Sequence, residues 1–132
     1  MLEVTEEVIQ EIVRRFVSVA DPRQIVLFGS WARGDARADS DVDMLVVEDG
    51  PFNAQNSRRD AAVRLDRALR GLAVPVDILV FTPEEVEKWR RSINHVVFDA
   101  LHEGRLLYDR SSPRPRDAGE GRGGPDRSAG DG

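Results

Sequence analysis

The sequence predicts an α/β (α+β) protein in which helices pack on a small β-sheet. Some segments repeat apolar residues at three- and four-residue spacing, which is typical of helices, whereas others are short apolar runs typical of strands. These segments follow one another in the order α-β-(α)-β-α-β-α-α, and this alternation predicts helices layered on one sheet. We expect residues 1–110 to form this domain. Residues 111–132 are rich in Gly and Pro with almost no apolar residues, so we expect a disordered tail.

The first predicted helix begins after Thr5, whose hydroxyl can cap it, and ends before the Asp21-Pro22 pair. Residues 25–28 follow as a continuous apolar run, which indicates a strand covered on both faces. The apolar face of the helix consists of Val8, Ile9, Ile12, Val13, Phe16 and Val17.

Residues 41–47 and 74–81 are predicted as the second and third strands, and a long helix over residues 55–70 separates them. The sequence Thr82-Pro83-Glu84-Glu85 predicts a helix start, because it combines a capping threonine, a first-turn proline and a glutamate three residues after the cap. One or two short helices then run to residue 102. Residues 106–108 are a short apolar extension.

Composition excludes several kinds of site. The chain has no Cys and two His, which excludes disulfides, thiolate metal sites and a Cys nucleophile, and argues against a multi-histidine zinc site. Its net charge of −5 argues against a basic nucleic-acid-binding surface. The longest apolar runs are far too short to span a membrane, and the acidic N-terminus is unlike a signal peptide, so we expect a soluble cytoplasmic protein.

Three aspartates are candidate metal ligands. Asp41 and Asp43 are two residues apart on the second strand, which places both carboxylates on one face, and Asp77 lies inside the apolar third strand. A carboxylate in an apolar strand is costly unless it is paired or bound to metal. If the two strands are neighbours, the three carboxylates form one cluster, and all-oxygen ligation suits Mg²⁺ or Mn²⁺.

A candidate phosphate-binding turn precedes these acids. Gly29 and Ser30 follow the first strand at a strand-to-helix turn, where backbone N–H groups can point at a phosphate and glycine permits close approach. Arg33, one turn further on, can supply positive charge. The segment is neither a Walker A loop nor a nucleophile elbow, so Ser30 is a poor nucleophile candidate.

Simpler interpretations compete at each position. Asp41 and Asp43 would also suit a solvated strand end, and Asp77 an edge strand. Trp31 is more simply a packing residue against the first helix than a base-stacking residue. Arg90 and His95 match a loose Arg-x4-His ribonuclease pattern, which we interpret as a surface arginine and histidine.

Taken together, the motifs resemble a known family. Gly29-Ser30, ten residues, and then Asp41-Val42-Asp43 is the Gly-Ser-x10-Asp-x-Asp signature of the DNA polymerase beta-like nucleotidyltransferase superfamily. The segments 28–34 and 40–46 look like its minimal nucleotidyltransferase (MNT) branch, and the strand around Asp77 matches the third carboxylate of that family. The resemblance covers about residues 5–108.

The resemblance implies the small mixed-sheet nucleotidyltransferase fold and a role for each candidate residue. Gly29 and Ser30, helped by Arg33, would hold the β- and γ-phosphates of a nucleoside triphosphate, with ATP the expected co-substrate. Asp41 and Asp43 would bind two Mg²⁺ ions. Asp77 would bind the metal nearer the attacking hydroxyl and orient or deprotonate that hydroxyl.

The chain is too short for the acceptor-binding domain that larger relatives carry, so the acceptor surface would belong to a partner protein or another subunit. MNT proteins pair with HEPN-domain ribonuclease toxins, and some transfer AMP to a toxin tyrosine. The chain therefore resembles an antitoxin of a HEPN/MNT pair. Two alternatives stay open: an antitoxin that acts mainly by binding, and a nucleotidyltransferase that modifies a small molecule or tRNA, although the net charge of −5 weighs against RNA.

Overall fold

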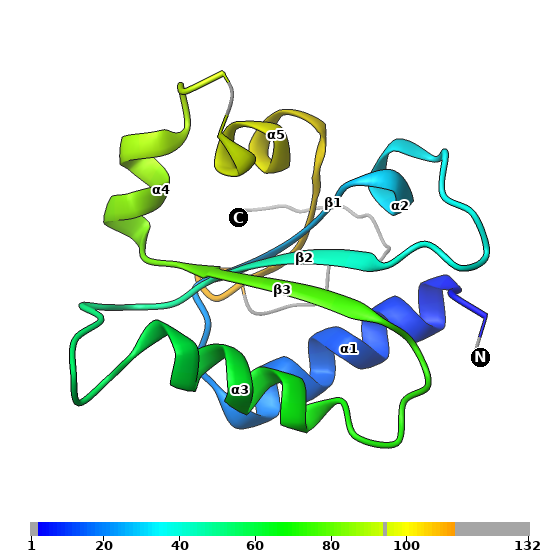
Figure 1. Ribbon diagram of the computed structural model, residues 1–132, viewed down its shortest axis with the longest axis horizontal. Helices are drawn as coiled ribbons and strands as arrows, with labels where there is room; N and C mark the ends of the chain where they lie inside the picture. The colour runs from blue at the N-terminus through cyan, green and yellow to red at the C-terminus, as the bar shows by residue number, and fades with distance from the viewer. Residues whose placement is uncertain (1–2, 94, 113–132) are drawn as a thin grey trace.

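The computed structural model describes residues 3–93 and 95–112, which form a four-stranded sheet covered by helices on both faces. Helices and strands alternate for most of the chain, as predicted (Figure 1). The elements are α1 (Glu6–Val19), β1 (Gln24–Phe28), α2 (Ser30–Arg33), β2 (Val42–Val47), α3 (Arg58–Ala68), β3 (Val76–Phe81), α4 (Pro83–Trp89), α5 (Val96–Glu103) and β4 (Arg105–Asp109).

The strand order in the sheet is β3-β2-β1-β4. β1 pairs antiparallel with both β2 and β4, whereas β2 and β3 are parallel, so the sheet is mixed. The parallel pair needs a crossover connection, and α3 supplies it between the two strands. Because β2 and β3 run in the same direction, their first residues, and with them the predicted carboxylates, lie at the same end of the sheet.

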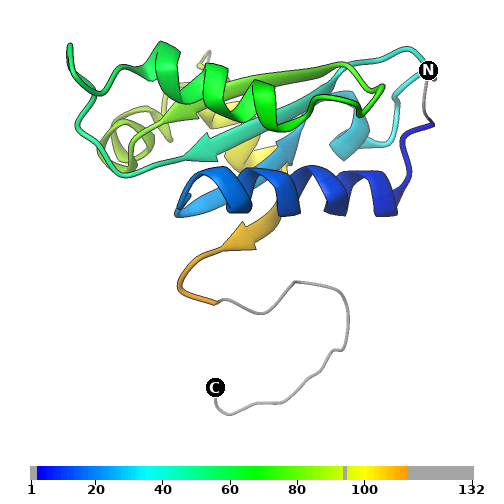
Figure 2. The ribbon, with the colours of Figure 1, turned by 90° about the horizontal axis from the view of Figure 1, so that it is seen from below.

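Two apolar cores sandwich the sheet. The larger core joins α1 and α3 to one face of the sheet, and Figure 2 shows these two helices side by side across it. The smaller core packs α4 and α5 against the opposite face. The apolar residues of β1 are buried toward both cores, which confirms the strand covered on both faces that residues 25–28 predicted.

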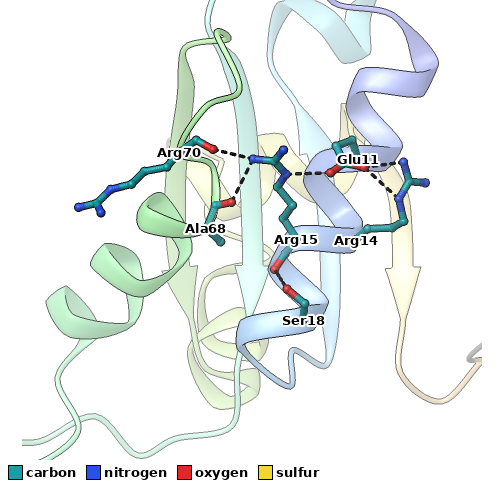
Figure 3. Close-up of polar contacts among 6 residues, drawn as sticks. All are labelled: Glu11, Arg14, Arg15, Ser18, Ala68 and Arg70. Atoms are coloured by element: carbon teal, nitrogen blue, oxygen red, sulfur yellow. Dashed lines mark hydrogen bonds and ion pairs between the residues drawn. The ribbon is translucent and has the colours of Figure 1, made fainter.

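Local side-chain chemistry fixes the helix ends as the sequence predicts. The Thr5 hydroxyl accepts a hydrogen bond from the Val8 N–H at 3.2 Å, and Thr82 forms a complete capping box with Glu85. A further contact is not visible in the sequence. Arg15 of α1 donates to the carbonyls of Ala68 and Arg70 at the end of α3 (Figure 3), which ties the two helices together.

Three elements begin later than the prediction. The helix predicted from residue 55 begins at Arg58, because the Asn53 side chain closes a turn by accepting from the N–H groups of Gln55 and Asn56. The third strand begins at Val76, after Pro75, which has no N–H to donate. The second strand begins at Val42 instead of residue 41.

The predicted apolar extension at residues 106–108 is part of strand β4, which pairs with β1 along one edge of the sheet. Three apolar residues are too few to indicate a strand without knowledge of the neighbour that it pairs with. Of the predicted tail, residues 113–132 lie outside the described residues. No helix in the described part of the chain is long and apolar enough to cross a membrane.

Candidate active site

The candidate site lies at the end of the sheet where β1 ends and where β2 and β3 begin. Asp43 is the register partner of Phe28 on β1 and of Asp77 on β3, so the two aspartates sit side by side in one row across the sheet. Asp41 directly precedes β2, two residues before Asp43 and on the same face of the chain. The structure therefore places Asp43 directly beside Asp77, with Asp41 in the loop end just before β2.

These carboxylates share the sheet face that α4 and α5 cover further along. Leu45 and Val47, which alternate with Asp43 on β2, are buried in the smaller core. Leu79 and Phe81, which alternate with Asp77 on β3, are partly buried and pack against it. The aspartates lie at the starts of these strands on the same face, before the helices begin to cover the sheet. The apolar core thus holds the strands in register while their first residues remain accessible.

Asp43 is the carboxylate most affected by its surroundings. It is half-buried, and burial is the main reason that its pKa lies above its usual range. The negative charges of Asp77 and Asp41 raise the pKa of Asp43 further, whereas Arg33 acts in the opposite direction. Three like charges close together oppose folding, which is the expected signature of a site built to receive a cation.

Asp77 lies on an edge strand, as its simpler interpretation predicted, and not in the buried position at which an unpaired carboxylate is costly. β3 is an outer strand of the sheet and the Asp77 side chain is exposed, so the residue avoids the desolvation cost that a central strand would impose. Its position next to Asp43 is nevertheless the one that the sequence predicted.

Gly29 brings the backbone against the Asp43 carboxylate. Its φ of 73° and ψ of −156° lie in a region that essentially only glycine adopts. A Cβ built on Gly29 would clash with Oδ2 of Asp43 and would lie 3.0 Å from its Cγ. Only glycine fits this close approach, which links the two halves of the sequence motif physically.

Ser30 begins the one-turn helix α2, and its half-buried side chain lies next to Gly29. The following residue, Trp31, packs against the larger core and donates its ring N–H to the carbonyl of Ser40 at 3.0 Å. The packing interpretation of Trp31 is confirmed. Its hydrogen bond fixes the loop immediately before Asp41 relative to the Gly29-Ser30 turn.

Arg33 is exposed at the end of α2 and carries two ion pairs. Its Nη1 lies 2.9 Å from Oε1 of Glu103, at the end of α5, and its Nε lies 3.3 Å from Oδ2 of Asp35. Hydrogen bonds to Glu103 and then Asp35 raise the pKa of the guanidinium above its usual range, so it stays charged. Arg33 is also close enough to Asp43 to favour the ionised form of that carboxyl.

Comparison with known proteins places this geometry in a family. The family model described as "Nucleotidyltransferase domain" matches residues 6–107. The chain belongs to this family. A candidate protein adenylyltransferase of Methanocaldococcus jannaschii is 35% identical over 107 residues, which cover 78% of this chain and 97% of that protein. The assignment confirms the resemblance that the Gly-Ser and Asp-x-Asp motifs predicted.

A solved structure shows the same fold. The crystal structure of a candidate nucleotidyltransferase from Sulfolobus solfataricus aligns with a TM-score of 0.56 and 25% sequence identity, covering 81% of this chain and 82% of that chain. The crystal structure of a toxin–antitoxin with AMP-PNP aligns with a TM-score of 0.48 and 21% identity, covering 80% of this chain and 74% of that chain.

The donor set of this nucleotidyltransferase suits a hard divalent cation. Asp41, Asp43 and Asp77 offer only carboxylate oxygens, which are the ligands that Mg²⁺ prefers. Among the described residues, no three His, Asp or Glu side chains are gathered tightly enough to hold a metal on their own. Mg²⁺ commonly retains waters and binds substrate phosphates beside one or two carboxylates, so this looser arrangement fits it.

Two site contacts could not be found from the sequence. Glu103 bonds Arg33 from 70 positions away, and nothing in either local pattern connects them. The bond between Trp31 and the Ser40 carbonyl involves backbone and likewise leaves no sequence signal.

The structure corrects the interpretation of His95 as a surface residue. Its ring is half-buried, stacks on Trp89 with centroids 4.5 Å apart, and accepts a hydrogen bond from the Val97 N–H as the cap of α5. His95 thus has a structural position in the helical layer of the nucleotidyltransferase.

Proposed function

We propose that this nucleotidyltransferase uses Mg²⁺ to transfer AMP from ATP to a hydroxyl of a partner protein, and that it serves as the antitoxin of a HEPN/MNT toxin–antitoxin pair. The observation that carries the transfer reaction is the contact between the Gly29 turn and the Asp43 carboxylate, with Asp77 beside it on the next strand. A phosphate-binding turn and a carboxylate set placed this close can act on one triphosphate.

Each residue has a distinct task in this proposal. Gly29 and Ser30 bind the β- and γ-phosphates, with Arg33 contributing positive charge at the rim. Asp41 and Asp43 hold the divalent cations, which supply charge neutralisation at the α-phosphate when bound. Asp77 orients the acceptor hydroxyl and accepts its proton.

The reaction balances as a nucleotidyl transfer. The acceptor oxygen forms a bond to the α-phosphorus, the bond from that phosphorus to the bridging oxygen breaks, and pyrophosphate leaves with its electron pair. The product carries an AMP group on its former hydroxyl.

A protein acceptor is supported by two observations. The Methanocaldococcus relative, which is 35% identical and matches over nearly its whole length, is described as a candidate protein adenylyltransferase. In addition, Asp77 is exposed on an outer strand, so a large acceptor can approach it. The antitoxin role is an inference from the resemblance to the MNT branch.

A label-transfer experiment tests the enzymatic proposal. The full chain is incubated with Mg²⁺, ATP labelled at its α-phosphate, and the product of the neighbouring gene. We expect the neighbouring protein to become labelled. The double variant Asp41→Ala/Asp43→Ala should reduce transfer by more than about 100-fold. Mutation of residues that merely hydrogen-bond to metal ligands already lowers metal affinity or activity by about 10- to 100-fold.

The matched control is Asp39→Ala, which removes an exposed aspartate from the same loop and should leave transfer unchanged. The melting temperature of the double variant should equal or exceed that of the parent, because like-charge repulsion is relieved. Equal transfer by the parent and the double variant, or no transfer with any nucleoside triphosphate, would refute the proposal.

Co-expression with the toxin tests the antitoxin role separately. If neutralisation requires transfer, the folded double variant fails to rescue growth while Asp39→Ala succeeds. Rescue by the double variant would instead show that neutralisation occurs by binding.

A further inference from the structure

No strand of residues 3–93 and 95–112 pairs with the outer edge of β3 beside Asp77, and the chemistry of this open edge indicates the acceptor. Building on the proposed function, we propose that the acceptor is an extended segment of the partner protein that adds to β3 as a fifth strand. In this arrangement the hydroxyl-bearing residue of the segment lies opposite Asp77, and apolar residues flank it.

The backbone of β3 supplies hydrogen-bonding groups at this edge. Val42 donates to the Pro75 carbonyl at 2.9 Å and Glu48 donates to the Phe81 carbonyl at 3.0 Å, so the odd-numbered residues of β3 point their backbone groups toward β2. In a parallel ladder the alternate residues point theirs the other way. Val76 and Ile78 therefore present N–H and C=O groups to the outside of the sheet.

The open edge is confined to the neighbourhood of Asp77. Further along the strand, Arg58 donates from Nη1 to the Val80 carbonyl at 2.7 Å and so occupies the outward acceptor of that residue. A docking strand is thereby restricted to the short stretch that contains Val76, Asp77 and Ile78. This is also the part of β3 next to the other carboxylates.

Strand addition would place the acceptor residue in the row of the active site. Phe28, Asp43 and Asp77 are aligned across β1, β2 and β3. A further strand lies about 4.8 Å beyond its neighbour, and residues in register point to the same face. The residue opposite Asp77 would direct its hydroxyl toward the carboxylates, whereas its two neighbours would point to the opposite face.

The opposite face offers a site for those two neighbours. A shallow groove of about 290 Å³ lies between α3 and β3, and four of its six lining residues are apolar, which predicts apolar residues on either side of the acceptor residue. The bond from Arg58 to the Val80 carbonyl shows that α3 starts near the end of β3, so Asp66 lies toward Val76 and Arg59 toward the other end. The groove is lined by Arg59, Ala62, Val63, Asp66, Val76 and Ile78.

These charges favour a segment with a basic residue at the Asp66 end and an acidic residue at the Arg59 end. A second copy of this chain fits less well. Antiparallel pairing of two β3 edges about Asp77 would set two aspartates opposite each other, which is destabilising, and would offer no hydroxyl at that position. The edge therefore fits a partner of different sequence.

Synthetic peptides test the docking mode directly. The probes are heptapeptides with a Val-Tyr-Val, Val-Thr-Val or Val-Ser-Val core between Arg and Glu residues, and copies that are N-methylated at all three core residues. Methylation removes the backbone donors and leaves every side chain in place. We expect at least one unmethylated peptide to be labelled from ATP at least tenfold faster than its methylated copy.

Amide hydrogen exchange of the full-length chain gives a readout that does not depend on transfer. Saturating unmethylated peptide should slow exchange of the Ile78 N–H at least tenfold, and the methylated copy should not. The proposal would be overturned by equal labelling of both copies, or by unchanged exchange at Ile78 with every peptide. It would also be overturned if exchange at Ile78 slowed with the concentration of the chain alone, because that would indicate self-pairing.

A protein variant probes the same edge. Ile78→Pro removes an outward N–H at an edge position that proline tolerates, and Ile78→Val is the matched control that keeps both the N–H and an apolar side chain. Transfer to the peptide should fall at least tenfold in the first variant alone, with Mg²⁺-dependent ATP binding retained in both. If the unmodified chain did not bind ATP, the proposed function would be refuted. The docking proposal is tested separately, because the hydrogen-exchange measurement does not need ATP.

Discussion

At the scale of single residues, the site depends on one close contact between backbone and carboxylate. Gly29 holds a glycine-only conformation and leaves room for Asp43, which links the phosphate turn to the metal ligands. The sequence predicts that both residues belong to the site. It does not reveal that they touch, because their proximity depends on the antiparallel pairing of β1 with β2.

Gly29→Ala should therefore damage both stability and function. A side chain at φ +73° costs about 1–3 kcal/mol, and its Cβ would displace the Asp43 carboxylate. We expect a lower midpoint of denaturant unfolding and at least a tenfold loss of AMP transfer. Gly34→Ala is the control, since Gly34 has a φ of +89° with nothing within 4 Å of a built Cβ. It should lose stability and keep transfer. Full transfer by Gly29→Ala would contradict the role of the contact.

Asp77 shows how far residue-level reasoning reaches. The sequence predicts its place beside Asp43 only if the second and third strands are neighbours. It leaves both a buried and an edge-strand position open for Asp77, because an apolar strand sequence does not distinguish a central strand from an outer strand covered by helices on both faces. The exposure of Asp77 follows from the strand order, in which β3 is outermost.

At the scale of elements, the junction of α3, β3 and α4 depends on a partly exposed ion pair. Arg58 donates to Oε1 of Glu85 at 2.8 Å, and its guanidinium lies 4.8 Å from the centre of the Phe52 ring. The hydrogen bond from Arg58 is the main reason that the pKa of Glu85 falls to about 2.

Glu85→Gln should reveal this contribution through its pH dependence. The folded-state pKa of Glu85 lies below the unfolded value of 4.5, so its stabilisation is complete above about pH 4.5 and is lost as the pH falls toward 2. Glutamine preserves the capping box, so the variant removes mainly the ion pair. We expect it to lose about 1 kcal/mol of unfolding free energy at pH 7, after allowance for solvent exposure, with the difference vanishing near pH 2–3.

Urea unfolding of both proteins between pH 3 and pH 7 measures the effect. Glu87→Gln, on the exposed side of α4, is the control and should change the unfolding free energy at pH 7 by less than about 0.5 kcal/mol. A difference between parent and Glu85→Gln that stays constant from pH 7 to pH 3 would contradict the assignment.

The junction of α1 with α3 allows a second comparison between neighbouring arginines. Both arginines pair with Glu11 of their own helix, but only Arg15 also bonds the carbonyls at the end of α3, at 3.3 Å for Ala68 and 2.9 Å for Arg70. Arg15→Ala should lower the unfolding free energy by about 1–2 kcal/mol, because the charged donor satisfies helix-end carbonyls.

Arg14→Ala should cost less than about 0.5 kcal/mol, since its pair is at the surface. Denaturant titrations of the parent and both variants would measure these losses, provided that the unfolding free energies depend on denaturant with equal slopes. Equal losses for the two variants would show that the contact across the helices contributes nothing.

At the scale of the whole molecule, the layered fold could be predicted from the alternation of helical and strand patterns, but the strand order could not. β4 was missed because its apolar stretch, residues 106–108, is only three residues long, and pairing with β1 rather than local sequence makes it a strand. Local sequence patterns indicate the periodicity of a helix or strand and the residues that cap a helix. They carry no information about which strand lies beside which, and the exposed edge of β3 depends on that arrangement.

The arrangement predicts an order of hydrogen-exchange protection. β2 lies between two strands and is buried on both faces, so its amides should open only with global unfolding. Among the strands of the described residues, β4 pairs only with β1 and should exchange faster. Exchange followed by mass spectrometry distinguishes the strands, and equal protection of β2 and β4 would argue against the strand order.

The tether between Trp31 and the Ser40 carbonyl has an optical consequence. The chain contains only two tryptophans, and this one sits between the phosphate turn and the loop that leads into Asp41. Its indole therefore serves as a fluorophore built into the site. In a Trp89→Phe background, the emission of Trp31 would report on the occupancy of the nucleotide site without any attached dye.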